Sequence, residues 1–197
     1  LAIVAEAAWK TARDYAVHVA THMLELGIHK QITNRLLEPW LWHTVIVSAT
    51  EWDNFFALRT HPDAQPEIRK IAVMMKDAYD ASHPKELTLN DWHLPLVADV
   101  LQLKDEGYSI NDLCLISVGR CARVSYLTHN GTREPEADIE LALRLQMSGH
   151  MSPFEHVARP VSTGENYKTA NFRGWVQYRK SIVNEDNFMK TLSARKG

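Results

Sequence analysis

The chain has 197 residues, of which 45% are hydrophobic, and its 22 Lys and Arg are nearly balanced by 24 Asp and Glu. This composition predicts one globular domain with a sizeable core, and a net charge of −2 gives no indication of a nucleic-acid partner. No apolar run approaches the roughly 20 residues that span a bilayer, and the charged, Ala-rich start does not resemble a signal peptide. The two cysteines, Cys114 and Cys121, fit neither a zinc spacing nor a disulfide framework, so we expect a cytoplasmic protein.

The first part of the chain is expected to be helical. Residues 1–26 read as one long helix that Gly27 ends, and a shorter helix should follow over 28–37 until Glu38-Pro39 stops it. Residues 43–48 are short and rich in β-branched side chains, which favours a buried strand or an extended segment. Thr50 is expected to cap a helix that carries Asn54 and Arg59.

Alternating breaks and periodic runs follow. Asp63 is expected to cap a helix with Ile68, Ala72 and Met75 on one face, and residues 82–95 should form a loop. Further helices are predicted from Ser109 to Arg120 and over 136–148, where Gly149 ends the second one. Two strands are predicted, over 154–161 and 172–178. The mixture predicts an α+β fold, helix-rich, with a small and mostly antiparallel sheet.

The segment Gly149-His150-Met151-Ser152-Pro153-Phe154-Glu155-His156 gathers polar groups at a helix exit. Glu155 could accept hydrogen bonds from a ribose or an amide. A loop with a capping serine is the simpler interpretation, and such short motifs match by chance. A serine hydrolase is a third interpretation, but the Gly-x-Ser-x-Gly turn is absent.

Two arginines, Arg35 and Arg59, are candidates for contact with a phosphate or a planar pyrimidine edge. Most arginines are exposed, so surface ion pairs are the alternative. His18 and His22 lie four residues apart on a helix, but the glutamate of the zinc-protease pattern is missing, so we predict no metal site.

Three segments together resemble the flavin-dependent thymidylate synthases. Cys121-Ala122-Arg123-Val124-Ser125-Tyr126 and His150–His156 resemble the first half of that family. The stretch from Asn54-Phe55-Phe56 to Arg59, followed by Ala64-Gln65-Pro66-Glu67-Ile68, resembles its last helical part. Asn34-Arg35-Leu36-Leu37-Glu38-Pro39 resembles the Arg-containing helix just upstream of that part. The similarity covers most of residues 28–75 and 117–160.

The order of these segments is reversed relative to the common form, which indicates a circularly permuted branch. In that order the family's signature, a Thr-His-Arg or Arg-His-Arg element followed by Ser, Asn and Arg, would precede residue 1. Residues 174–180 are only faintly similar to it and are interpreted as a terminal strand. We therefore expect the natural protein to extend upstream of this chain.

The resemblance implies a single domain over 1–197, with a helical nucleotide-binding part (1–81) and an α+β flavin-binding part (109–180). It implies methylation of dUMP with methylenetetrahydrofolate, FAD and hydride from NADPH, in a homotetramer with flavin sites at subunit interfaces. The cysteines need not be catalytic in such a scheme, because the flavin carries the redox step.

The resemblance also assigns roles to individual residues. Asn54, Ser152 and Glu155 match flavin-contacting positions, and Arg35 and Arg59 match substrate-binding positions. His150 and Arg59 are the implied catalytic residues, since His150 would lie by the flavin ring and Arg59 would polarise the pyrimidine. Ser48 and Thr50 replace an Asn and an Arg that commonly contact the flavin. The alternative is a non-catalytic nucleotide-binding or assembly relative that kept the fold.

Overall fold

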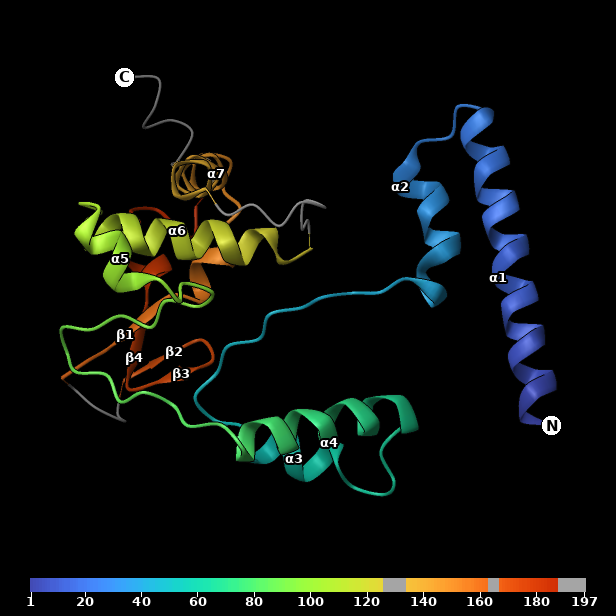
Figure 1. The fold of residues 1–197 in the computed structure, drawn as a ribbon, viewed down its shortest axis with the longest axis horizontal. Helices are drawn as coiled ribbons and strands as arrows, with labels where there is room; N and C mark the ends of the chain where they lie inside the picture. The colour runs from blue at the N-terminus through green and yellow to red at the C-terminus, as the bar shows by residue number, and fades with distance from the viewer. Residues whose placement is uncertain (126–133, 163–166, 188–197) are drawn as a thin grey trace. The chain divides into compact units, whose positions relative to one another are not determined.

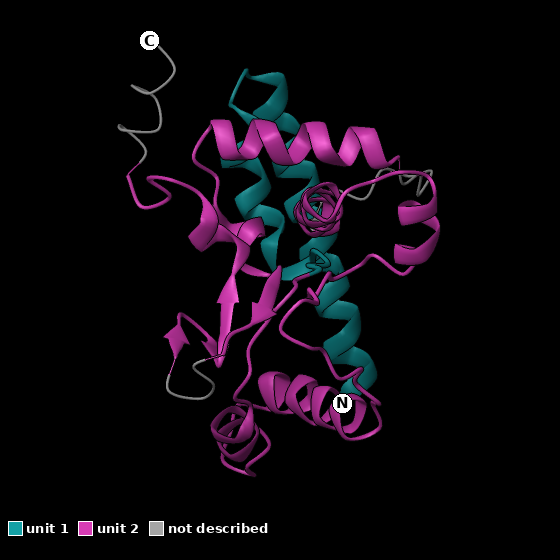
Figure 2. Cartoon of the chain, turned by 90° about the vertical axis from the view of Figure 1, so that its left-hand side faces the viewer, with its two compact units in different colours: residues 1–44 teal, residues 45–197 magenta. Residues whose placement is uncertain are grey.

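The computed structural model describes residues 1–125, 134–162 and 167–187 (Figure 1). The chain divides into two compact units, Leu1–Thr44 and Val45–Gly197, which Figure 2 shows in teal and magenta. The boundary between these units lies within the predicted helical part, residues 1–81.

Unit 1 consists of helices. Helix α1 spans Ala2–Glu25 and Gly27 follows it with φ of +83°, as predicted. Helix α2 is limited to Lys30–Thr33 and continues as a 3₁₀ helix, η1, over Asn34–Trp40. The prediction that Glu38-Pro39 stops the helix is wrong, because the fixed φ of proline is compatible with 3₁₀ geometry. Trp40 then packs on Trp9 of α1, with ring centroids 5.3 Å apart.

Residues 43–48 were predicted to be a buried strand or an extended segment. The buried strand is wrong, because residues 41–49 form no regular element and Val45 and Val47 are exposed. Their β-branched composition favours a strand only where another strand supplies hydrogen bonds. The first backbone hydrogen bond from this region to the strands is made just after it, where the N–H of Thr50 donates to the carbonyl of Asn171 at 3.1 Å.

Helices α3 (Asp53–Arg59) and α4 (Pro66–Asp80) form a packed pair joined by aromatic contacts. Neither has the predicted cap. Trp52 precedes α3, and the hydroxyl of Thr50 instead accepts from the N–H of Arg173 at 2.8 Å. Gln65 precedes α4, where Pro66 supplies a φ suited to the first turn. Ala72 is fully buried, as expected for the core face of α4.

The main core lies around helix α6 (Ile110–Ala122), which packs on α7 (Pro135–Met147). The short helix α5 (Val100–Asp105) precedes α6, and the 3₁₀ turn η2 (Arg123–Ser125) follows it. Ser109 forms a complete capping box with Asp112, which confirms the predicted start of α6. Every residue from Leu113 to Cys121 is buried, so α6 is the central helix of unit 2.

A buried ion network joins α6 to α7. The carboxylate of Asp138, 1% exposed, accepts from Nε of Arg120 at 3.3 Å and from Nε of Arg123 at 2.8 Å. The Arg120 guanidinium also reaches Asp99 at 2.9 Å and the carbonyl of Leu96 at 3.1 Å. The Asp138 carboxylate therefore holds two cations, and one of them, Arg120, ties the loop before α5 to the core.

The strands are shorter than predicted. The 3₁₀ turn η3 (Ser152–Glu155) replaces the start of the first one, and only Ala158–Pro160 forms β1. Gly174, with φ of +75°, divides the second into β3 (Phe172–Arg173) and β4 (Trp175–Gln177), followed by η5 (Tyr178–Ser181). β1 pairs with β4, and β2 (Lys168–Thr169) pairs with β3, both antiparallel. The predicted α+β class, helix-rich with a small antiparallel sheet, is confirmed.

Candidate functional site

The polar segment after α7 is held by its apolar residues. Gly149 has φ of +76° and turns the chain out of the helix. Met151 and Phe154 then enter the core next to α6, and Phe154 is fully buried and stacks on Tyr178. Ser152 lies between Met151 and Phe154 and is exposed, and Glu155 follows Phe154 and is half-buried.

Ser152 and Glu155 line one cavity of about 230 Å³. The extended segment before α3 supplies the facing wall, and the strands supply the remainder; the other lining residues are Ile46, Val47, Ser48, His156, Asn171 and Gln177. All of them belong to unit 2. Ser152 and Glu155 thus share a cavity with residues 46–48, which lie more than 100 positions earlier in the chain.

A hydrogen bond between Ser48 and His156 joins two walls of this cavity. Ser48 Oγ lies 3.1 Å from Nδ1 of His156. Burial lowers the pKa of His156, and nearby His93 lowers it further, while Glu155 acts in the opposite sense. The imidazole is therefore neutral near pH 7, and Ser48 and His156 can exchange donor and acceptor roles.

Glu155 is fixed by residues from the C-terminal part of the chain. Its carboxylate pairs with Arg179 of η5, which also pairs with Glu185. Its backbone carbonyl accepts from Nε2 of Gln177 at 3.0 Å. Charge and backbone of Glu155 are thus both held, so the residue presents a preorganised acceptor at the cavity wall.

The remaining candidates lie away from this cavity. Asn54 and Arg59 are exposed on α3, and neither lines the cavity. His150 is exposed at the end of α7, where its Nδ1 lies 2.8 Å from Oγ of Ser148. Arg35 is exposed on η1 and belongs to unit 1. Of these candidates, Ser152 and Glu155 line this cavity.

The two histidines of the motif do not activate Ser152. His156 bonds to Ser48 and His150 to Ser148. A serine nucleophile needs a base within hydrogen-bond reach. The contacts at Ser152 therefore give the hydrolase interpretation no support.

Both cysteines are free thiols that lie buried in unit 2. Burial raises the pKa of both Cys114 and Cys121 to about 12, so both remain protonated and weakly nucleophilic. Residues 1–125, 134–162 and 167–187 contain no group of three His, Cys, Asp or Glu that could hold a metal ion. Over the same ranges, no helix has the length and apolar character that crossing a membrane requires.

Comparison with known families identifies the N-terminal part of the chain. Residues 4–85 match the family model described as thymidylate synthase complementing protein. This part of the chain is therefore similar to the thymidylate synthase complementing protein family. The resemblance to flavin-dependent thymidylate synthases is thereby confirmed. No curated protein and no solved structure matches the chain.

The family match includes Arg35, Asn54 and Arg59 and ends before the second group of candidates. Ser152 and Glu155 lie outside the stretch that matches the thymidylate synthase complementing protein model. They are connected to it through the hydrogen bond of Ser48, which is a matched residue. The cavity therefore combines a wall from the family-matched part with a wall from the segment after α7.

Sequence reasoning missed several residues around the cavity. Gln177 and Arg179 lie in the stretch that was interpreted only as a terminal strand, and Asn171 lies just before β3. The signal that could have found them is their order, since the polar residues Gln177, Arg179 and Lys180 flank Tyr178, a half-buried aromatic residue that stacks on Phe154. Pairing between β1 and β4 then brings them to η3.

Proposed function

We propose that this chain is part of a flavin-dependent thymidylate synthase, which methylates dUMP to dTMP with methylenetetrahydrofolate and with hydride from NADPH. The family match over residues 4–85 carries the proposal. It includes both candidate nucleotide-binding arginines and Asn54. The cavity supports it, because Ser152 and Glu155, two of the three residues that the resemblance assigns to the flavin, lie in one preorganised wall.

The cavity residues fit part of a flavin cofactor. Hydroxyl, amide, imidazole and carboxylate groups in one cavity can donate to and accept from a ribose or a pyrimidine-like ring. A cavity of about 230 Å³ is smaller than the roughly 300–1,000 Å³ of complete ligand pockets. One chain therefore supplies part of the site, which agrees with a homotetramer whose flavin sites lie between subunits.

Each residue has a distinct task in the proposed reaction. Ser152, Glu155 and Asn54 would hold the FAD, which supplies the hydride chemistry when bound. Arg35 and Arg59 would bind the nucleotide. Because a guanidinium stabilises negative charge that develops on the pyrimidine, Arg59 would also lower the barrier. His150, at the exit of α7, would contribute to the face where folate and nicotinamide are received.

A non-catalytic relative is the second candidate, because residues 1–197 lack the Thr-His-Arg or Arg-His-Arg element of the family. Such a protein could retain the fold and Arg59 without flavin chemistry. Flavin binding separates the two, since the enzyme requires it and the relative does not.

Titration of the protein with FAD, followed by quenching of flavin fluorescence, tests the proposal. Glu155→Ala should weaken FAD binding about tenfold, as expected when a charge-assisted contact is lost. His150→Ala should bind FAD normally and reduce only turnover. Glu140→Ala, which removes an exposed carboxylate from α7, is the matched control.

Glu155 also pairs with Arg179, so its variant needs a structural check. Circular dichroism and thermal denaturation of Glu155→Ala and Glu155→Gln provide it. Folded variants that bind FAD as tightly as the parent would contradict the assignment of Glu155.

A further inference from the structure

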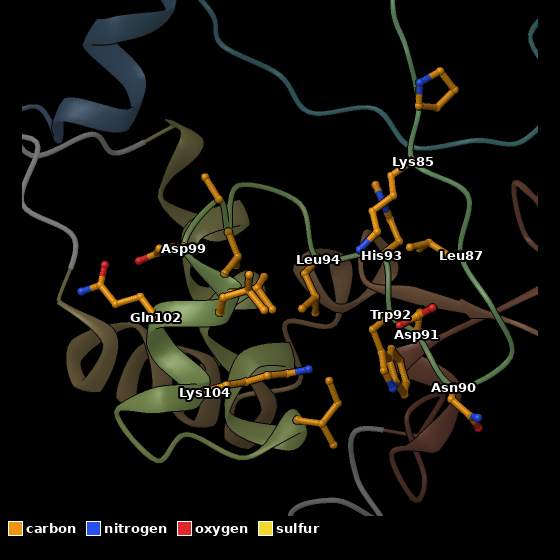
Figure 3. Close-up of a pocket in the computed structure, with 16 residues that line it drawn as sticks. Lys85, Leu87, Asn90, Asp91, Trp92, His93, Leu94, Asp99, Gln102 and Lys104 are labelled. Carbon is orange, nitrogen blue, oxygen red and sulfur yellow. The ribbon is translucent and has the colours of Figure 1, made fainter.

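A second and larger cavity lies between the loop that precedes α5 and α5 itself (Figure 3). Its volume is about 660 Å³, which is within the range of small-molecule pockets. It shares no lining residue with the cavity at Ser152 and Glu155. The roles proposed above for Arg35, Arg59 and the flavin contacts do not involve it.

The loop wall of this cavity is held in place by several bonds. His93 and Ala158 form a backbone bridge, with the N–H of His93 donating at 2.7 Å. Ser117 of α6 donates to the carbonyl of Pro95 at 2.7 Å, and Arg120 binds the carbonyl of Leu96. Leu96 has φ of +64°, a conformation that a leucine adopts only when its surroundings enforce it. The wall is therefore preformed.

Trp92 gives this wall a flat apolar surface. Its ring is fixed edge-on against Tyr178, with centroids 5.6 Å apart, and the Arg159 guanidinium lies 5.8 Å from its centre. Leu94 lies next to it along the loop and packs on the same core cluster. Two anchored apolar side chains thus face the cavity, and an aromatic surface of this kind favours a planar ligand.

The charged groups at the cavity leave an excess of positive charge. Asp99 pairs with Arg120. Asp91 accepts from the N–H and hydroxyl of Thr88 at 2.9 and 2.8 Å, and its negative charge acts on Lys85 and Lys104, so it offsets one of these two positive charges. In the described part of the chain, neither Lys85 nor Lys104 forms an ion pair. In Figure 3 the Lys104 side chain extends from α5 toward the side that carries Trp92, and Lys85 projects from the loop opposite α5.

We propose that this cavity binds a planar aromatic anion, with its ring on Trp92 and Leu94 and its carboxylate or phosphate at Lys104 and Lys85. Apolar walls with a few convergent polar groups are what a ligand of this kind requires. The ammonium groups supply the charge, and the anchored loop limits the entropy lost on binding.

Calorimetric titration of the whole protein with two aromatic anions tests this proposal. N-(4-aminobenzoyl)-L-glutamate carries carboxylates and phenyl phosphate carries a phosphate, so the comparison identifies the anion. Lys104→Met should weaken binding about threefold or more, and the Lys85→Met, Lys104→Met double variant about tenfold, with binding weaker at high salt. Trp92→Leu should weaken it as well, and Lys10→Met on α1 is the matched control.

Saturable binding of either aromatic anion with these losses supports the proposal. Binding that is absent at millimolar concentration, or equally tight in the lysine variants, would overturn it. Inorganic phosphate or uncharged benzamide binding as tightly as the aromatic anions would also overturn it, because the ring or the charge would then be unnecessary. Lys85 and Lys104 are exposed, so their variants should fold even if Trp92→Leu does not.

Discussion

Individual residues in this chain are positioned by partners that lie far away in the sequence. Ser48 bonds to His156 and Thr50 to Arg173, and Glu155 pairs with Arg179. The candidate residues of the motif after α7 therefore depend on two other segments. Substitutions at either partner should affect the cavity as much as substitutions in the motif itself.

Arg59 is the residue on which substrate binding should depend most. It is exposed on α3, so Arg59→Ala should leave the fold intact. Loss of a charge-assisted contact should weaken dUMP binding about tenfold or more. Isothermal titration with dUMP measures this, with Arg69→Ala on α4 as a control that also removes an exposed arginine. Unchanged dUMP affinity in Arg59→Ala would refute the assignment.

His156 should make stability depend on pH. Burial keeps its pKa in the folded state below the usual 6.5, so the folded protein binds fewer protons than the unfolded chain. Its contribution is therefore present above about pH 6.5 and is lost as the pH falls toward the folded-state pKa. His156→Gln should flatten the slope of the unfolding free energy against pH below 6.5.

Urea denaturation at a series of pH values measures that slope. His93 has a pKa lowered by burial as well, so His156→Gln should retain part of the dependence and the double variant with His93→Gln should lose more. An unchanged slope in the double variant would show that these imidazoles titrate alike in both states.

At the scale of elements, the packing of α6 on α7 stabilises unit 2. A Cβ added at Gly119 would lie 2.4 Å from the backbone oxygen of Asp138. The backbones of α6 and α7 can approach this closely because Gly119 has no side chain. Gly119→Ala must push two backbones apart and should lower the free energy of unfolding by about 1–3 kcal/mol. Thermal denaturation alongside Glu140→Ala checks this, and equal stability of the two variants would contradict it.

Asp138 is the second link between α6 and α7. Asp138→Ala leaves the Arg120 charge, 5% exposed, without its buried partner. Breaking a buried pair from one side costs about 3–5 kcal/mol. Urea denaturation should show this loss, whereas an exposed control such as Glu140→Ala should change stability by less than about 0.5 kcal/mol. A loss no larger than the control's would mean that the network does not stabilise the fold.

Several helix ends of this chain could be predicted because their signals are local. Ser109 with Asp112, Gly27 and Gly149 all act through neighbouring backbone groups, and each prediction is confirmed. Whether residues 43–48 form a strand could not be predicted from their own composition, because a strand needs a neighbouring strand to pair with and the sequence does not reveal one. Gly174 likewise divides a predicted strand by a backbone conformation that the apolar pattern does not encode.

The candidate site could be predicted only in part for the same reason. Ser152 and Glu155 were found because the motif is contiguous, and they share a cavity. Gln177 reaches the cavity through the pairing of β1 with β4, Asn171 lines it from the turn between β2 and β3, and Arg179 of η5 pairs with Glu155. These contacts are long-range, and residue types alone do not predict them.

At the scale of the whole molecule, the chain consists of two compact units, and the candidates are divided between them. Arg35 lies in unit 1, whereas Arg59, Asn54 and the cavity residues lie in unit 2. The family match crosses the boundary between the units at residues 44 and 45. Tests of the proposed activity therefore need a chain that contains both units.

Release of tritium from 5-tritiated dUMP by the complete gene product is the most direct test of the central claim. The assay contains methylenetetrahydrofolate, FAD and NADPH. We predict tritium release that requires both FAD and NADPH and that falls about tenfold or more in Arg59→Ala. A folded protein that releases no tritium, or that does so equally well without FAD, would contradict the assignment as a flavin-dependent thymidylate synthase.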